Sequence, residues 1–301
     1  MECIGVIGGI AADVEGRPFR ILIPADSNPG IVKVSHGGVG RNIAENLVHM
    51  GENNVVFCSV VGDDELGRAA LDSLAQSGID PSGIAVLQDG RTSMYLSILD
   101  NDGEMVLAVS DMDIFKQFTP HLIEAQRALL ADASVVALDA NLPEETLAHC
   151  AQVFSDKKIF ADPVSVHKAR RLCSILPACY AVKPNRIEAE QLVGFPIRNE
   201  RQLTDAGKAL LDMGVCYVFI SLGQDGLFFM DQNEKGLLSV EMPYALESVT
   251  GAGDAASAAI VDGLARNLPI EKIAAQAMRA SKLTLQTQER VHPDIGTIRL
   301  V

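Results

Sequence analysis

The most informative stretch of the sequence is Val249-Thr250-Gly251-Ala252-Gly253-Asp254, which runs directly into the small residues 255–259. A glycine-rich loop that opens into a helix can aim several backbone N–H groups at one point, where the helix dipole adds partial positive charge. Such a loop suits a phosphoryl group whose negative charge spreads in a transition state. The amides of Gly251, Ala252 and Gly253 are therefore candidate phosphate-binding groups.

Asp254 is the candidate catalytic residue of this stretch. It falls in the first turn of the expected helix, where its carboxylate could take a proton from a hydroxyl nucleophile. An Asp at this place is also a common N-cap after a turn. The stretch alone leaves both interpretations open, because short motifs often match by chance.

Around this stretch, short apolar runs alternate with longer segments of helical period. The apolar runs cover residues 3–7, 55–61, 134–138, 158–160, 179–182 and 215–222. The helical segments cover residues 41–50, 65–77, 144–155, 188–192, 202–213, 255–266 and 270–286. Strands that alternate with helices imply right-handed crossovers and a mostly parallel sheet covered on both faces. The predicted fold class is therefore α/β.

Two segments, at about residues 15–35 and 91–110, do not fit this alternation. In the second, residues 92–99 and 104–109 flank the turn sequence Asp100-Asn101-Asp102-Gly103, which predicts a hairpin. We expect both segments to join a small second sheet that lies over the carboxyl ends of the main strands as a lid.

In the first of these segments the expected strands are residues 20–23 and 31–34, on either side of a stretch rich in Pro, Asp, Asn and Gly. No linker composition divides the chain elsewhere. Residues 1–301 are therefore expected to form one domain.

Three further motifs each end a predicted strand or begin a predicted helix. They are Ser35-His36-Gly37-Gly38-Val39-Gly40-Arg41-Asn42, Lys183-Pro184-Asn185-Arg186-Ile187-Glu188 and Ser221-Leu222-Gly223-Gln224-Asp225-Gly226. The glycines of the first motif would let a polar substrate lie against the backbone; a tight turn before a helix is the alternative. The third would bring backbone groups to a nucleotide at a strand end, with an ordinary glycine turn as its alternative.

In the second motif, Asn185 and Glu188 are three residues apart and can share one helix face. A carboxylate and an amide suit Mg²⁺ and its bound waters, because Mg²⁺ keeps much of its hydration shell. A capping box is a second and compatible interpretation. Asp13 and Asp139, at predicted strand ends, would accept paired sugar hydroxyls or cap a turn.

Composition limits the class of protein. The chain has 39 acidic and 25 basic side chains, and its net charge of −14 argues against binding nucleic acid polymers. No apolar run is long enough for a membrane span, and the N-terminus has no basic region typical of a signal peptide. The six cysteines form no C-x-x-C pair, so we expect free thiols and a cytoplasmic location. Neither a P-loop nor a dinucleotide fingerprint is present, which weakens a dehydrogenase interpretation.

Taken in order, Asp13 and the motifs Gly-Gly-x-Gly-x-Asn, Lys-Pro-Asn-x-x-Glu, Ser-Leu-Gly-x-x-Gly and Gly-Ala-Gly-Asp resemble the ribokinase-like (PfkB) family of carbohydrate and nucleoside kinases. The resemblance covers nearly the whole chain. It implies a three-layer α/β sandwich with a small β-sheet lid, and it implies ATP, Mg²⁺ and a small sugar or nucleoside as ligands. Because the lids of this family often pair between two chains, it also implies a homodimer through the lid.

The resemblance assigns a role to each matching position. Asp254 would activate a primary hydroxyl, and Gly251, Ala252 and Gly253 would form the anion hole. The implied nucleotide-binding residues are Asn185, Ser221, Gly223 and Gly226, with Glu188 near Mg²⁺ through a water molecule. The implied substrate-binding residues are Asp13, Gly37, Gly38, Arg41, Asn42, Asp139 and, in the lid, Thr92 and Ser93.

Residues 37–47, 95–105 and 162–165 are most similar to members of the family that act on pseudouridine. This similarity implies phosphoryl transfer from ATP to the 5′-hydroxyl of pseudouridine. Ribose, fructose or a purine nucleoside are alternative substrates, and a non-catalytic nucleotide- or sugar-binding regulator is an alternative class. Many relatives have Asp-Thr before the Gly-Ala-Gly-Asp box where this chain has Ser248-Val249, which leaves K⁺ activation open.

Overall fold

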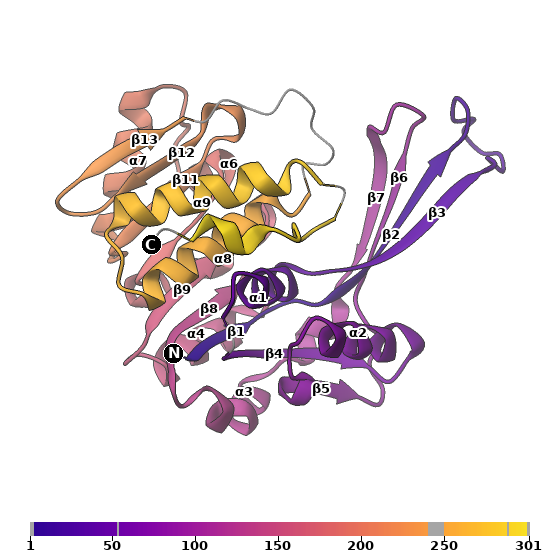
Figure 1. Ribbon diagram of the computed structural model, residues 1–301, viewed down its shortest axis with the longest axis horizontal. Coiled ribbons are helices and arrows are strands. Elements are labelled where there is room, and N and C mark those ends of the chain that lie inside the picture. The colour runs from indigo at the N-terminus through magenta and orange to yellow at the C-terminus, as the bar shows by residue number, and fades with distance from the viewer. Residues whose placement is uncertain (1–2, 53, 240–249, 288, 300–301) are drawn as a thin grey trace.

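The computed structural model describes residues 3–52, 54–239, 250–287 and 289–299. The strands of its main sheet are β1 Cys3–Ile7, β4 Val55–Gly62, β5 Ile84–Leu87, β8 Ala133–Asp139, β9 Lys158–Asp162, β10 Ala181–Val182, β11 Tyr217–Ser221, β12 Leu227–Met230 and β13 Lys235–Leu238. They follow the order β13-β12-β11-β10-β9-β8-β1-β4-β5 (Figure 1). Pairing is parallel from β11 to β5 and antiparallel between β11, β12 and β13. The prediction of a mostly parallel sheet is confirmed.

Helices cover both faces of this sheet, which makes three layers. On one face lie α1 Val39–His49, α2 Glu65–Gln76, α8 Ala252–Ala265 and α9 Ile270–Thr284, whose buried side chains share one apolar cluster. On the other lie α3 Pro120–Gln126, α4 Glu144–Val153, α5 Val166–Ala169, α6 Arg186–Val193 and α7 Glu200–Asp212. The predicted α/β sandwich is therefore present.

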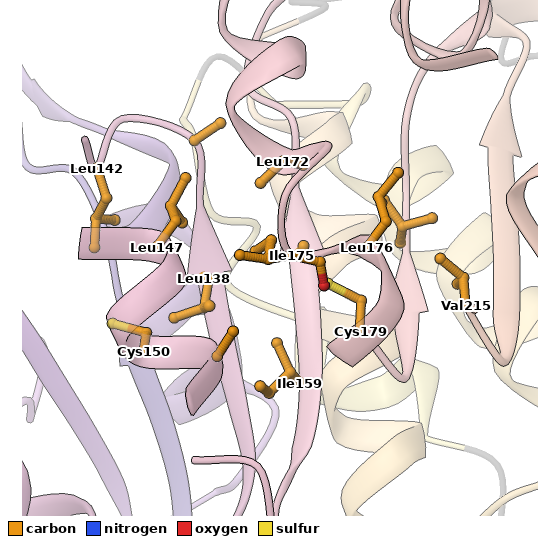
Figure 2. Packing of buried hydrophobic residues seen from close by; sticks show 14 of the residues in the cluster. Leu138, Leu142, Leu147, Cys150, Ile159, Leu172, Ile175, Leu176, Cys179 and Val215 are labelled. Carbon is orange, nitrogen blue, oxygen red and sulfur yellow. The ribbon is translucent and has the colours of Figure 1, made fainter. Parts of the chain in front are cut away.

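The two apolar clusters follow directly from the sequence pattern. Strand residues are apolar on both faces, and helix residues on one stripe, so each layer buries its apolar side chains against the next. Figure 2 shows one such contact, where Leu138 of β8 lies close to Leu147 and Cys150 of α4. Burial of each Leu or Ile side chain contributes about 1.5–3 kcal/mol.

The second sheet has four strands in the order β3-β2-β6-β7, with β2 Ala11–Pro18, β3 Gly30–Gly37, β6 Met94–Leu99 and β7 Met105–Asp111. It stands out from the body of the molecule in Figure 1. The β6–β7 hairpin turns at the predicted Asp100–Gly103 sequence, where the Asp100 N–H donates to the Glu104 carbonyl at 2.8 Å. Pairing is antiparallel in both hairpins and parallel between β2 and β6.

The prediction of one strand, at residues 20–23, was wrong. Residues 20–23 lie in the loop between β2 and β3, and the strand that pairs with β3 is Ala11–Pro18. Gly16 and Pro18 weaken the local strand pattern, but eight register pairs with β3 and five with β6 fix this segment as the central strand. Asp13 therefore lies within a strand and not after one.

The two faces of the small sheet differ in polarity. Directly paired residues point to the same face, and one row across the sheet is Val34, Val14, Leu96 and Val109. The neighbouring row includes Asp13 and lies on the opposite face. Val32, Val34, Leu107 and Val109 are each at least half exposed, so the apolar face is open to solvent.

All six cysteines are free thiols, and Cys3, Cys58, Cys150 and Cys179 are buried. Burial raises the pKa of Cys58 and Cys179 to about 12, which keeps them as neutral apolar groups. Within the described ranges, none of the helices combines the length and the apolar character that a membrane crossing requires.

Candidate active site

The carboxyl ends of the parallel strands bring polar residues to one edge of the main sheet. β9 ends at Asp162, β10 leads into Lys183, and β11 ends at Ser221. In a doubly wound sheet, ligands bind at this edge because the backbone there is not covered by the crossover helices. The first turn of α8 reaches the same region, since the position of a Cβ on Gly253 would be 3.9 Å from the Lys183 Nζ.

The start of α8 has the geometry of an anion site. Gly251 is its N-cap with φ +87, and a Cβ there would lie 2.7 Å from the Arg290 carbonyl oxygen. Only glycine fits this conformation and this close approach. The first intrahelical bond runs from the Ala255 N–H to the Gly251 carbonyl, so the amides of the first turn have no partner within the helix. These amides and the helix dipole favour a negative charge.

Asp254 lies in that first turn and accepts a hydrogen bond from the Asn42 Nδ2 at 2.7 Å. Partial burial, and then the nearby Asp162 carboxylate, raise the pKa of Asp254 to about 7. The Asn42 hydrogen bond and the positive charges of Lys183 and Arg290 act in the opposite direction. A carboxyl group with a pKa near neutrality is suited to accept a proton from a hydroxyl at physiological pH.

Asp13 and the glycines that precede α1 lie together beside this helix start. Gly38 has φ +101, and a Cβ on it would lie 2.4 Å from the Gly9 carbonyl oxygen. A Cβ on Gly37 would lie 2.2 Å from the Asp13 Oδ2, so the carboxylate lies directly over that backbone. Asp13 forms an ion pair with Arg290. Burial raises the pKa of Asp13, and Arg290 opposes that shift.

Arg41 is paired with protein groups. Its guanidinium forms a salt bridge with Glu45 at 2.7 Å and donates to the His36 carbonyl at 2.9 Å. The side chain is only 8% exposed. Arg41 therefore stabilises the first turns of α1 through an i, i+4 pair, and its contact with a substrate stays a prediction.

Asp139 is buried and bonded to the main chain. It is 1% exposed and accepts the backbone N–H groups of Gly9, Gly40 and Asn141 at 2.7, 2.7 and 2.8 Å. Both of its oxygens therefore have a structural role. Binding of substrate hydroxyls by Asp139 stays a prediction.

Thr92 and Ser93 are also committed to protein groups. Thr92 Oγ1 donates to Asp64 at 2.7 Å and accepts from the Gly62 N–H at 3.0 Å. Ser93 donates to the Ile10 carbonyl. Both residues are buried at the base of the small sheet, so their hydroxyls join the sheet to the body. Recognition of a substrate by these two residues stays a prediction.

Three of the four expected nucleotide residues, Asn185, Ser221 and Gly223, line one open cleft. A cavity of about 450 Å³ is lined by Asn185, Arg186, Ile187, Ser221, Leu222, Gly223, Gln224 and Asp225. A backbone bridge joins Asn185 to Ser221, which brings two of the predicted motifs together. Gly223 and Gly226 have φ +62 and +103, so the turn between β11 and β12 depends on them.

Asn185 and Glu188 form the capping box that the sequence suggested. Asn185 Oδ1 accepts the Glu188 N–H at 2.9 Å, and Glu188 Oε2 accepts the Asn185 N–H at 2.8 Å. Glu188 Oε1 makes no hydrogen bond to the residues that the structure describes. This carboxylate oxygen lies in the first turn of α6, next to the cleft-lining Asn185, and its chemistry fits a water molecule bound to Mg²⁺.

Two charged residues of the site, Lys183 and Arg290, had no predicted role, and the sequence left Asp162 open between hydroxyl binding and capping of a turn. Lys183 is buried, and its Nζ lies 3.5 Å from Asp162 Oδ2. Arg290 reaches Asp13 from the segment after α9. Lys183 and Asp162 could have been found from the sequence, because a charged residue at the end of an apolar strand often lies at a binding site. Arg290 lies in an irregular segment after α9 that has no sequence pattern. Ser248 and Val249 lie outside the described residues.

Comparison with known proteins agrees with this arrangement. The chain matches the family described as pfkB family carbohydrate kinase over residues 1–294. It is 32% identical to the pseudouridine kinase of Escherichia coli (strain K12) over 300 residues, covering 100% of this chain and 96% of the relative.

Solved structures extend the comparison. A putative sugar kinase from Clostridium perfringens is 36% identical, with a TM-score of 0.85 over 99% of this chain and 94% of that chain. The ribokinase of Thermotoga maritima, 20% identical, has the same fold, with a TM-score of 0.87 over 99% of both chains. The predicted ribokinase-like fold is confirmed, and the chain belongs to the pfkB family of carbohydrate kinases, phosphotransferases whose acceptor is an alcohol group.

Proposed function

We propose that this chain is an ATP-dependent kinase that phosphorylates the 5′-hydroxyl of pseudouridine, giving pseudouridine 5′-phosphate and ADP. The observation that carries the proposal is the start of α8, where Asp254 accepts a hydrogen bond from Asn42 beside first-turn amides that have no partner within the helix. The choice of pseudouridine is supported by the full-length similarity to the Escherichia coli pseudouridine kinase.

In the proposed reaction, Asp254 accepts the proton of the 5′-hydroxyl as that oxygen attacks phosphorus. The amides of Gly251, Ala252 and Gly253 stabilise the charge that spreads over the transferred phosphoryl group. Lys183 adds a full positive charge beside them, at a depth where screening by water is weak. Positioning and electrostatics of this kind supply most of the rate enhancement in phosphoryl transfer.

The open cleft is the proposed site of ATP, with Asn185, Ser221 and Gly223 as its contacts. Gly226, which closes the turn after β11, is a further proposed nucleotide contact. Glu188 would hold Mg²⁺ through a bound water, and the ion would neutralise charge on the phosphates. The proposed ribose contacts are Asp13, Gly37, Gly38 and Asn42. The Asp13 carboxylate lies over the backbone of Gly37, and Asn42 donates a hydrogen bond to Asp254.

A cytoplasmic location is proposed from the six free thiols, which persist in a reducing compartment. Activation by K⁺ is a separate proposal. Its sequence marker, Ser248-Val249, lies outside the described residues, so assay with and without K⁺ decides it.

The lid also supports a proposed homodimer. The apolar face of the small sheet presents Val32, Val34, Leu107 and Val109 to solvent, next to the half-buried Leu96. A continuous exposed apolar face on a sheet marks a protein interface. A second copy of the chain presents the same face, so a two-fold contact between two lids would cover both.

The first prediction concerns the substrate. ADP release is measured with ATP, Mg²⁺ and pseudouridine, uridine, adenosine, ribose or fructose. We expect kcat/KM for pseudouridine to exceed that for uridine by about tenfold or more, because the two differ in one or two hydrogen bonds of the uracil edge. Turnover of a different compound and not of pseudouridine would support the proposed kinase activity and reject pseudouridine as the substrate. Folded protein that binds ATP but turns over no member would indicate a regulator.

The second prediction concerns the base. Asp254→Asn keeps an oxygen for the Asn42 hydrogen bond and removes the proton acceptor, so kcat should fall by about 10²–10⁴-fold. ATP affinity, measured by calorimetry, should change little, and the melting temperature at pH 8 should not fall, because a charged carboxylate leaves a poorly solvated site. Turnover near that of the unsubstituted enzyme would reject Asp254 as the base.

The third prediction concerns pH. Because the pKa of Asp254 is raised to about 7, its proton-accepting form is lost as the pH falls through that value. The profile of kcat/KM against pH, measured at saturating ATP, should fall about tenfold per pH unit below neutrality. An acidic limb close to pH 4, the ordinary value for Asp, would contradict this geometry.

The fourth prediction concerns assembly. Light scattering of the unsubstituted protein should give the mass of a dimer. Val34→Lys places a charge on the apolar face and should give monomers, whereas Ile31→Lys, on the opposite face of the same strand and similarly exposed, should leave the dimer intact. A monomeric unsubstituted protein, or equal effects of both variants, would reject a dimer through this face.

A further inference from the structure

A carboxylate that the phosphoryl transfer does not itself use lies between α8 and the buried Lys183. Asp162, the last residue of β9, is 5% exposed. Its Oδ1 accepts the Val164 N–H at 2.8 Å, and its Oδ2 accepts the Ser257 hydroxyl at 2.7 Å. The same Oδ2 lies 3.5 Å from the Lys183 Nζ. Asp162 therefore has a fixed hydrogen bond on each oxygen as well as an ion pair.

Ser257 connects this carboxylate to the catalytic turn. It lies three residues after Asp254 on α8, so the two side chains share one face of the helix. The residue is fully buried, and its hydroxyl oxygen is also 3.1 Å from the Gly253 carbonyl oxygen. The Asp162–Ser257 hydrogen bond thus joins the carboxyl end of β9 to the turn that bears the anion site.

The backbone after Asp162 is strained in a way that fits this role. Val164 has φ +66, a left-handed conformation that is uncommon for a β-branched residue. In this conformation its N–H donates to Asp162. Strain of this kind persists where the surroundings fix the chain, and it concentrates at functional sites.

The charges that face Asp254 come from three segments. β9 contributes Asp162, the residues after β10 contribute Lys183, and the segment after α9 contributes Arg290, while α1 contributes the neutral Asn42. Glu188 of α6 interacts with Lys183 and Asp162. A buried ammonium group needs a carboxylate partner. Without Asp162, the carboxylates left for Lys183 are Glu188 and Asp254 itself.

We infer that Asp162 is a positioning residue of the phosphoryl-transfer site: it holds Lys183 in an ion pair and fixes the first turns of α8 through Ser257, so that Asp254 stays available as a base. The inference rests on the proposed function for the role of Asp254. A direct Lys183–Asp254 pair would neutralise the base and withdraw the cation from the anion site. Asp162 prevents both by taking the ammonium group itself.

The test is a direct titration of Asp254. The full chain is labelled with ¹³Cγ-aspartate, the Asp254 signal is assigned by its loss in D254N, and its shift is followed from about pH 4.5 to pH 9. Asp162→Asn keeps the shape and a hydrogen-bonding oxygen but removes the charge. Ser257→Ala, the matched control, keeps every charge and removes only the link to α8. Thermal melting confirms that each variant is folded.

We expect the Asp254 pKa in D162N to be lower by about 1 or more, because a like charge is lost and Lys183 turns to Asp254. In S257A it should change by less than about 0.5, while kcat falls with little change in the KM for ATP. An Asp254 pKa in D162N within about 0.3 of the unsubstituted value would overturn the inference. If D162N does not fold, S257A decides: a larger change in its Asp254 pKa, or an unchanged kcat, overturns it.

The titration needs no acceptor substrate. A chain that turns over no member of the substrate panel would reject the proposed function and still give the Asp254 titrations. With an active acceptor, the acidic limb of kcat/KM in D162N should move in the same direction as the titration.

Discussion

The buried carboxylate of Asp139 fixes the start of α1 relative to the end of β1. Asp139 binds the backbone N–H groups of Gly9, after β1, and of Gly40, in the first turn of α1. Glycine at 40 lets the helix pack against the backbone of Gly8, where a Cβ would be 2.8 Å from the Gly8 Cα. Only from this position can Asn42, two residues further along α1, reach Asp254, 212 residues away in the sequence, at 2.7 Å. The candidate site therefore depends on hydrogen bonds between one carboxylate and the main chain.

The candidate site places the charged groups of Asp254, Asp162 and Lys183 where few water molecules can solvate them. This placement lowers the free energy of unfolding. Because the pKa of Asp254 is higher in the folded chain than in the unfolded chain, the protonated form stabilises the fold at low pH. That contribution is lost as the pH rises from about 4 through about 7. Lys183 and Asp162 offset part of each other's burial cost by pairing. Near neutral pH the ionised form of Asp254, which can accept a proton, is thus gained at the expense of stability.

The sequence predicted the parts of this protein whose signal is local. The parallel strands, the helices between them, the turn at Asp100–Gly103 and the start of α8 after a glycine-rich loop all have a short-range pattern. β2 was misplaced because Gly16 and Pro18 hide a strand that long-range pairing with β3 and β6 fixes. Thr92 was expected to contact a substrate from the family resemblance, and Asp139 from its place at a strand end. Neither signal showed that buried backbone amides donate hydrogen bonds to the same oxygens. No local pattern tells which partner a polar side chain will find.

The register between β2 and β3 determines which residues lie on each face of the small sheet. Strand side chains alternate between faces, so Asp13 and Val14 of β2 must point in opposite directions. Pairing of Asp13 with Ser35, and of Val14 with Val34, puts the carboxylate over Gly37 and extends an apolar row across the sheet. A slip of one residue would carry Asp13 to the outer face and a valine into the polar pocket. The position of the proposed ribose carboxylate and the apolar face proposed to join two lids are therefore consequences of one strand pairing, and a change that altered the register would remove both together.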